Sequence, residues 1–166
     1  VYFCFQVAEE VGGGAIELVE YLKARGGVDG VIGTHVDGGS DAGVIYLPDG
    51  PLMAGAHLYE ITVQGSGGHG SRPDKAVDPI KPACDILLKI AAIPAQYHNP
   101  FDTCVVSSCQ IHAGSASNII PETAVIGGNI RFFKYGDDEL LLERIRLVAE
   151  NTAAAYGATA TVTHSV

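Results

Sequence analysis

The sequence predicts a mixed α/β fold in two parts, a partial parallel βαβ segment over residues 1–56 and a βαββαβ arrangement over residues 57–166. Three observations carry this prediction. Short apolar runs alternate with stretches whose apolar residues recur at helical spacing. A stretch rich in glycine and proline, residues 37–56, separates the two parts. The second part then has the order strand, helix, strand twice in succession.

In the first part, the apolar runs predict strands over residues 1–7 and 28–36, and apolar residues at helical spacing predict a helix over 15–24. Two parallel strands joined by a helix form a crossover unit, in which the carboxyl ends of both strands lie on the same edge of the sheet. Such a unit is too small to close a core, because parallel strands are normally covered on both faces. Standing alone, it is expected to be disordered or swapped.

The second part begins after the turn signal Pro48-Asp49-Gly50-Pro51. Its pattern predicts strands over 58–64, 103–112, 123–133 and 159–164, and helices over 79–93 and 138–156. This order is typical of a ferredoxin-like domain, an antiparallel sheet with two helices on one face. Asp78 is the expected cap of the first helix. Pro82 predicts an irregular first turn or a later start.

Composition excludes several classes of function. The chain has 166 residues and a net charge of −9, and its ten Lys and Arg form no basic run, so we expect no nucleic-acid partner. No apolar stretch reaches membrane-spanning length. The apolar start lacks the basic flank and cleavage site of a signal peptide. The four cysteines show no metal-binding spacing and are expected to be reduced, as in a cytoplasmic protein.

Two adjacent acids, Glu9 and Glu10, follow the first predicted strand, and His35 lies at the end of the second. Because both strand ends meet at one sheet edge, we expect these three side chains to converge there. One carboxylate can then act as a general base, while the other and the imidazole hold a metal ion. The alternative is structural, since paired acids also complement the dipole at a helix start.

Three further candidates lie in the second part. His69 sits in a loop with four glycines, residues 65–73, which allows it to approach another molecule closely. A flexible loop or a phosphate cradle is the alternative. Asn118 lies in a loop of small polar residues, and the alternative to a functional role is that its side chain only stabilises a turn. Arg131 alternates with apolar neighbours on a strand, where it either faces solvent or grips a carboxylate.

Together these segments resemble the aminoacylase and carboxypeptidase family of metal-dependent amidohydrolases, and within it the branch of hippurate hydrolase and auxin-conjugate hydrolases. The resemblance spans essentially the whole chain. It rests on five segments in the family's order: Phe5-Gln6-Val7-Ala8-Glu9-Glu10, Gly33-Thr34-His35-Val36, Gly67-Gly68-His69-Gly70-Ser71-Arg72-Pro73, Ala116-Ser117-Asn118-Ile119-Ile120-Pro121 and Arg131.

The resemblance implies a role for each candidate. Glu9 is similar to the family's general base, and Glu10 and His35 to ligands of one or two divalent ions, zinc or manganese. His69 and Asn118 resemble the transition-state contacts, and Arg131 the group that binds the substrate carboxylate. The implied substrate is an N-acyl amino acid or small peptide. The second part would be a lid that forms a homodimer and reaches the partner's active site with its loop histidine.

The chain also departs from the family. An upstream Cys-x-His ligand pair and a distant histidine of the catalytic domain are missing, so two metal ligands remain where a catalytic zinc usually has three. We therefore expect the fragment to be much less active than its parent, or inactive. Two alternatives stay open: a non-enzymatic dimerisation module, because an unpaired sheet edge invites pairing, and a small-molecule sensor built on the ferredoxin-like half.

Overall fold

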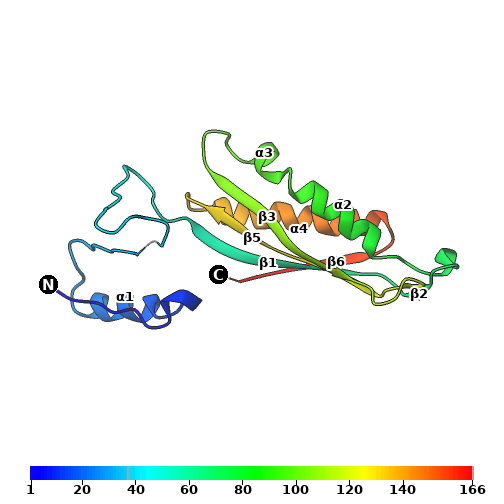
Figure 1. Ribbon diagram of the computed structural model, residues 1–166, viewed down its shortest axis with the longest axis horizontal. Coiled ribbons are helices and arrows are strands. Elements are labelled where there is room, and N and C mark those ends of the chain that lie inside the picture. The colour runs from blue at the N-terminus through cyan, green and yellow to red at the C-terminus, as the bar shows by residue number, and fades with distance from the viewer. Residues whose placement is uncertain (37, 166) are drawn as a thin grey trace. The chain divides into compact units, whose positions relative to one another are not determined.

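The computed structural model describes residues 1–36 and 38–165 (Figure 1). The chain divides into two compact units, Val1–Leu47 and Pro48–Val166. We describe each unit separately.

The first unit contains one turn of 3₁₀ helix, η1 (Glu9–Val11), and one α-helix, α1 (Ala15–Ala24). The helix has the bounds that its apolar spacing predicts. Gly14 precedes it with φ of 77°, and a Cβ at this position would overlap the backbone of Val7. Glycine is therefore required at residue 14, immediately before the helix.

The two strands predicted in the first unit, over residues 1–7 and 28–36, are not formed. A strand needs a hydrogen-bonded neighbour and a covered face, and the apolar side chains of these segments have neither here. Phe3 and Phe5 are each 84% exposed, and Ile32 is 95% exposed. The prediction of these two strands is wrong, because no element of the described residues pairs with their backbones or covers their apolar side chains.

The second unit has the predicted βαββαβ order around a four-stranded sheet. The strands are β1 (Gly55–Gln64), β3 (Cys104–Ala113), β5 (Thr123–Phe132) and β6 (Thr159–Ser165). They lie in the order β3-β5-β1-β6, and every neighbouring pair is antiparallel. The main helices, α2 (Ile80–Ile90) and α4 (Asp137–Ala155), lie on the same face of this sheet (Figure 1). The ferredoxin-like prediction is confirmed.

The first predicted helix of this unit, 79–93, is divided in two. Helix α2 ends at Ile90, and a short helix, α3 (Ile93–Tyr97), follows after Ala91 and Ala92. The N-cap position is Pro79 and not the expected Asp78, whose carboxylate still accepts the backbone N–H of Ile80 at 2.9 Å. Because the helix begins at Ile80, Pro82 falls in the first turn, where no backbone donor is needed.

The core lies between the sheet and the two long helices. Its largest buried side chains include Ile61 and Val63 of β1, Ile126 and Ile130 of β5, Ile86 and Ile90 of α2, and Leu141 and Ile145 of α4. On α4, Leu141, Ile145 and Thr152 are buried and Val148 packs against the core, so these residues form the inward face of the helix. Burying these side chains is the main source of stability of the unit.

The first turn of α4 is anchored by two acid–imidazole contacts. Asp137 meets Nε2 of His98, at the end of α3, at 2.8 Å, and both side chains are buried. Asp138 lies 3.3 Å from Nε2 of His57 in β1. The two acids also complement the positive end of the helix dipole. Together they fix where α4 begins relative to the sheet.

Candidate functional site

In the first unit, the structure brings Glu9 and His35 together. Nε2 of His35 lies 4.0 Å from a carboxylate oxygen of Glu9, and the two side chains are 62% and 53% exposed. Glu10 is the next residue of η1 and is also exposed. Gln6 supports this turn by donating its side-chain amide to the carbonyl of Gly13 at 2.6 Å.

The His35 imidazole has the arrangement of a metal ligand. Its Nδ1 donates to the backbone carbonyl of Val36 at 2.6 Å, which leaves a lone pair on Nε2. Metal-binding histidines commonly donate their second ring N–H to a carbonyl or carboxylate in this way. Imidazole nitrogen and carboxylate oxygen are also suitable ligands for zinc and manganese. The residues present therefore fit a divalent ion.

The set of donors is nevertheless small. Among residues 1–36 and 38–165, no three His, Cys, Asp or Glu side chains gather closely enough to hold a metal ion. Catalytic zinc sites usually have three protein ligands. Glu10 and His35 alone therefore do not complete such a set.

In the second unit, a small two-stranded sheet joins the loops of His69 and Asn118. Strand β2 (Gly68–His69) pairs with β4 (Ile119–Ile120), and His69 lies opposite Ile119. The backbone N–H of Gly70 donates to the carbonyl of Asn118 at 2.8 Å. Neither strand could be predicted from the sequence, because a strand of two residues is too short to show an alternating pattern. The nearest signal was the pair of apolar residues after Asn118.

The His69 side chain is exposed, and its Nδ1 faces the next turn of the loop. This nitrogen lies 2.8 Å from the Ser71 hydroxyl and accepts the Ser71 backbone N–H at 3.2 Å. Beyond it, Arg72 holds Asp74 with two hydrogen bonds, of 2.9 and 2.8 Å. The hydrogen bonds from Arg72 lower the pKa of the Asp74 carboxyl. The loop is therefore an ordered turn with its own polar contacts.

Arg131 lies at the other end of the sheet. It is an exposed residue of β5, opposite Ala56 of β1 and Val105 of β3, while its neighbour Ile130 is buried. From Thr123, where β5 begins after β4, the strand runs roughly 26 Å to Arg131 at about 3.3 Å per residue. Within one copy of the chain, Arg131 and His69 are thus far apart.

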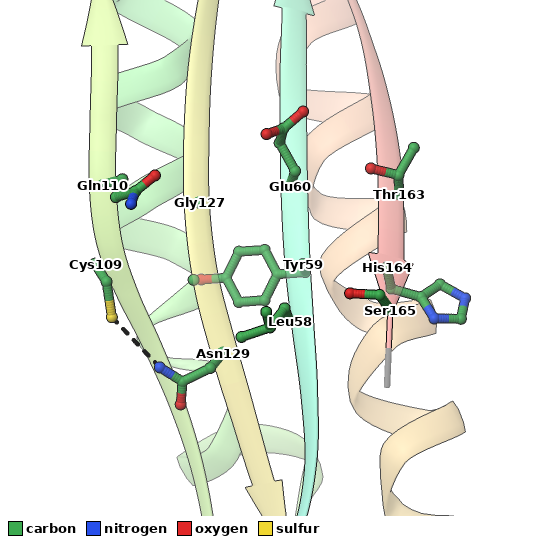
Figure 2. A pocket seen from close by; sticks show the side chains of 11 residues that line it. Leu58, Tyr59, Glu60, Cys109, Gln110, Gly127, Asn129, Thr163, His164 and Ser165 are labelled. Atoms are coloured by element: carbon green, nitrogen blue, oxygen red, sulfur yellow. Dashed lines mark hydrogen bonds between the residues drawn. The ribbon is translucent and has the colours of Figure 1, made fainter. Parts of the chain in front are cut away.

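A hollow of about 440 Å³ lies on the sheet and includes none of the six candidate residues (Figure 2). Two glycines of β5, Gly127 and Gly128, leave its floor without side chains. On its β3 side, the Asn129 amide donates to the sulfur of Cys109 at 3.4 Å (Figure 2). The hollow is lined by Leu58, Tyr59, Glu60, Cys109, Gln110, Gly127, Gly128, Asn129, Thr163, His164 and Ser165.

Comparison with known proteins identifies the family. A family model described as a peptidase dimerisation domain matches residues 53–157. An N-acetylcysteine deacetylase of Bacillus subtilis is 35% identical over 96% of the chain. An IAA-amino acid hydrolase of Arabidopsis thaliana is 32% identical over 98% of it. The chain spans 42% of the first relative and 37% of the second.

A solved structure agrees with these relatives. The crystal structure of a dinuclear metal-binding peptidase of the M20 family from Bacillus subtilis covers 96% of this chain with a TM-score of 0.71 and 31% identity. The chain covers 39% of that structure.

Among residues 1–36 and 38–165 of this chain, no helix is long and apolar enough to cross a membrane. The chain belongs to the M20 peptidase family and contains its dimerisation domain.

Proposed function

We propose that the parent protein hydrolyses the amide bond of N-acyl amino acids or small peptides with the help of one or two divalent ions, zinc or manganese. The observation that carries this proposal is the contact between Glu9 and His35, in which an acid and a metal-competent imidazole meet at 4.0 Å. The names of the two relatives support it, because a deacetylase of N-acetylcysteine and a hydrolase of IAA-amino acids both cleave an amide bond next to an amino acid.

In this proposal, Glu10 and His35 hold the metal and Glu9 moves the proton. A divalent ion, when bound, supplies Lewis-acid activation of the amide carbonyl. Glu9 takes a proton from the attacking water and passes it to the leaving nitrogen, as a general base and then a general acid. Its 53% exposed side chain is free to meet both groups.

The second unit would provide contacts to the substrate. His69 and Asn118 lie on loops joined by the Gly70–Asn118 hydrogen bond, so both can donate to the oxygen that becomes negative during attack. Arg131 would bind the substrate carboxylate, for which its planar group can form two parallel hydrogen bonds.

One copy of the chain cannot place all these groups on one substrate. Arg131 lies roughly 26 Å along β5 from Thr123, which closely follows the β4 segment that pairs with His69, whereas an N-acyl amino acid is only about 10 Å long. A second copy that supplies one of the two residues removes this conflict. We therefore propose a homodimer in which His69 acts in the active site of the partner.

The free edge of β3 and the outer face of α2 provide a surface for such a dimer. β3 is an edge strand, and α2 contacts both it and β5. Helix α2 exposes an apolar stripe that consists of Ile80, Cys84 and Leu88, and Leu88 is 70% exposed. An exposed edge beside an apolar stripe is suited to pairing with a second copy.

In this scheme, residues 1–56 belong to the metal-binding domain and residues 57–166 form the lid. The fragment would have little or no activity, since its ligand set is incomplete, and would act by itself only as a dimerisation module. The proposed compartment is the cytoplasm. All four cysteines are free, which suits reducing conditions.

The activity is tested by assaying the full-length parent on N-acetyl and N-benzoyl amino acids after loading with manganese or zinc. Turnover that disappears with a chelator and returns with the metal is the expected result. A metal-loaded, folded parent that cleaves none of these amides would rule the proposal out.

The dimer is tested by sedimentation of the 166-residue chain. We expect a dimer that dissociates when Leu88 is replaced by Glu, because a charge would be buried at the interface. Ala154→Glu, at an exposed position near the end of α4, is the matched control and should leave the dimer intact. A wild-type chain that sediments as a monomer at high concentration would contradict the proposed interface.

A further inference from the structure

Residues 69–72 form a turn in which Ser71 contacts the His69 imidazole. The backbone carbonyl of His69 accepts the N–H of Arg72 at 2.8 Å, which defines a turn over residues 69–72. Within this turn, the Ser71 backbone N–H points at Nδ1 of His69 at 3.2 Å, and the Ser71 hydroxyl lies 2.8 Å from the same nitrogen. One residue thus directs two polar groups at one ring nitrogen.

These contacts favour one position for the proton on the ring. A backbone N–H can only donate, so its contact at 3.2 Å favours the tautomer in which Nδ1 offers a lone pair to Ser71. A neutral imidazole has a single N–H, which then lies on Nε2. The Ser71 hydroxyl can also donate to Nδ1, and it thereby favours the same tautomer.

We propose that Ser71 is a positioning residue that holds His69 in the tautomer protonated at Nε2. This inference rests on the proposed function, in which His69 donates a hydrogen bond to the developing oxyanion. Only the tautomer protonated at Nε2 presents a donor on the side of the ring that points away from the loop. The opposite tautomer would present a lone pair to a negative oxygen, which is repulsive.

Two neighbouring residues of the loop already have other hydrogen-bond partners, which leaves Ser71 to orient the His69 ring. Arg72 is already engaged by Asp74, through hydrogen bonds of 2.9 and 2.8 Å. Gly70 donates to Asn118, so its N–H is also occupied. Because the imidazole is exposed, burial does not restrict its rotation. The two groups of Ser71 therefore supply both the orientation and the choice of tautomer.

The tautomer is measured directly by ¹⁵N NMR of the His69 ring in the 166-residue chain, without any substrate. At a pH where the ring is neutral, we expect the wild-type shifts to show the proton on Nε2. Ser71→Ala keeps the backbone donor but removes the hydroxyl, so the shifts should move toward a mixture of tautomers. Ser71→Thr should restore the wild-type pattern. Thr161→Ala, an exposed hydroxyl on β6, should change nothing.

The kinetic arm uses the metal-loaded parent protein. We expect Ser71→Ala to lower kcat on the order of 10-fold with little change in KM, since only the transition state loses a well-oriented donor. Ser71→Thr should recover most of kcat.

The NMR and kinetic experiments test different claims. A parent protein that cleaves no amide would rule out the proposed function, while the NMR result would still show which tautomer His69 adopts. If His69 carries its proton on Nδ1, or if Ser71→Ala alters neither the ring shifts nor kcat in an active parent, Ser71 is not a positioning residue.

Discussion

Gly70 donates its backbone N–H to the carbonyl of Asn118 at 2.8 Å, and this bond joins the loops of two proposed transition-state contacts, His69 and Asn118. The approach is close because Gly70 has no side chain. A Cβ at this position would lie 3.1 Å from the carbonyl oxygen of Asn118. The spacing of the two loops therefore depends on glycine at residue 70.

Replacing Gly70 by Ala should push the loops apart by a few tenths of an ångström. We expect turnover by the parent protein to fall about 10-fold, because small displacements of positioned groups are costly for catalysis. The free energy of unfolding should change by less than about 1 kcal/mol. Gly30→Ala is the control, since a Cβ there meets nothing within 4 Å. Equal turnover in both variants would contradict the role of this spacing.

A second prediction concerns Gly128, which pairs with Tyr59 and lies against its ring. The Tyr59 side chain extends from β1 across β5 toward β3 (Figure 2). The phenol donates to the carbonyl of Ser107 at 3.1 Å and lies 2.9 Å from the Ser108 hydroxyl. A Cβ at Gly128 would overlap both the ring of Tyr59 and the Ser107 carbonyl. Gly128→Ala should therefore destabilise the chain by about 1–3 kcal/mol in urea denaturation.

Gly127→Ala is the matched variant on the same strand. There the nearest atom to the added Cβ is the flexible amide end of Gln110, at 3.2 Å, which can move aside. We expect a clearly smaller loss of stability. Equal losses in the two variants would show that the crossing of Tyr59 does not set the requirement for glycine.

The stability of the chain should also depend on Tyr59 at high pH. Burial raises the pKa of Tyr59, and the hydrogen bond to Ser108 partly opposes this. A raised folded-state pKa means that the unfolded chain ionises first, above about pH 10. The contribution of Tyr59 is thus complete below that pH and is lost as the pH rises.

Urea denaturation between pH 8 and 11 measures this effect. As the pH rises, the free energy of unfolding should fall less steeply for Tyr59→Phe than for the wild type. Cys104 and Tyr156 also have raised pKa values and act in the same direction, but they are present in both proteins. Identical pH profiles for wild type and variant would show that the Tyr59 phenol does not ionise differently on unfolding.

Much of the second unit could be predicted from sequence, because each part of it has a local signal. Ile61 and Val63 alternate with exposed residues on β1, and Leu141 and Ile145 recur at helical spacing on α4. The β2–β4 pair could not be predicted, since its register depends on a bond between Gly70 and Asn118 from distant parts of the sequence. The break after Ile90 was also missed, because Ala91 and Ala92 are good helix formers.

The first unit shows the opposite case. Phe3, Phe5 and Ile32 lie in runs typical of buried strands, yet they are exposed here. A local pattern shows that a segment can be buried but not whether the covering elements are present. The convergence of Glu9 and His35 was nevertheless expected from the sequence, and the structure places them 4.0 Å apart.

A mixed-dimer experiment tests whether His69 acts in the partner's active site. The parent variants Glu9→Gln and His69→Ala should each be nearly inactive alone. In a heterodimer, one site would combine an intact Glu9 with an intact His69 from the other copy. Random mixing should then restore about a quarter of wild-type activity in a symmetric dimer. If mixing restores nothing although heterodimers form, His69 does not act across the dimer.

The central claim is that Glu9 transfers protons during amide hydrolysis, and Glu9→Gln in the metal-loaded parent tests it most directly. The substitution preserves shape but removes the base. We predict a fall in kcat well beyond about 100-fold, with unchanged metal content. Glu17→Gln, an exposed acid in the first turn of α1, should retain full activity. Near wild-type turnover by the Glu9→Gln protein would contradict the account.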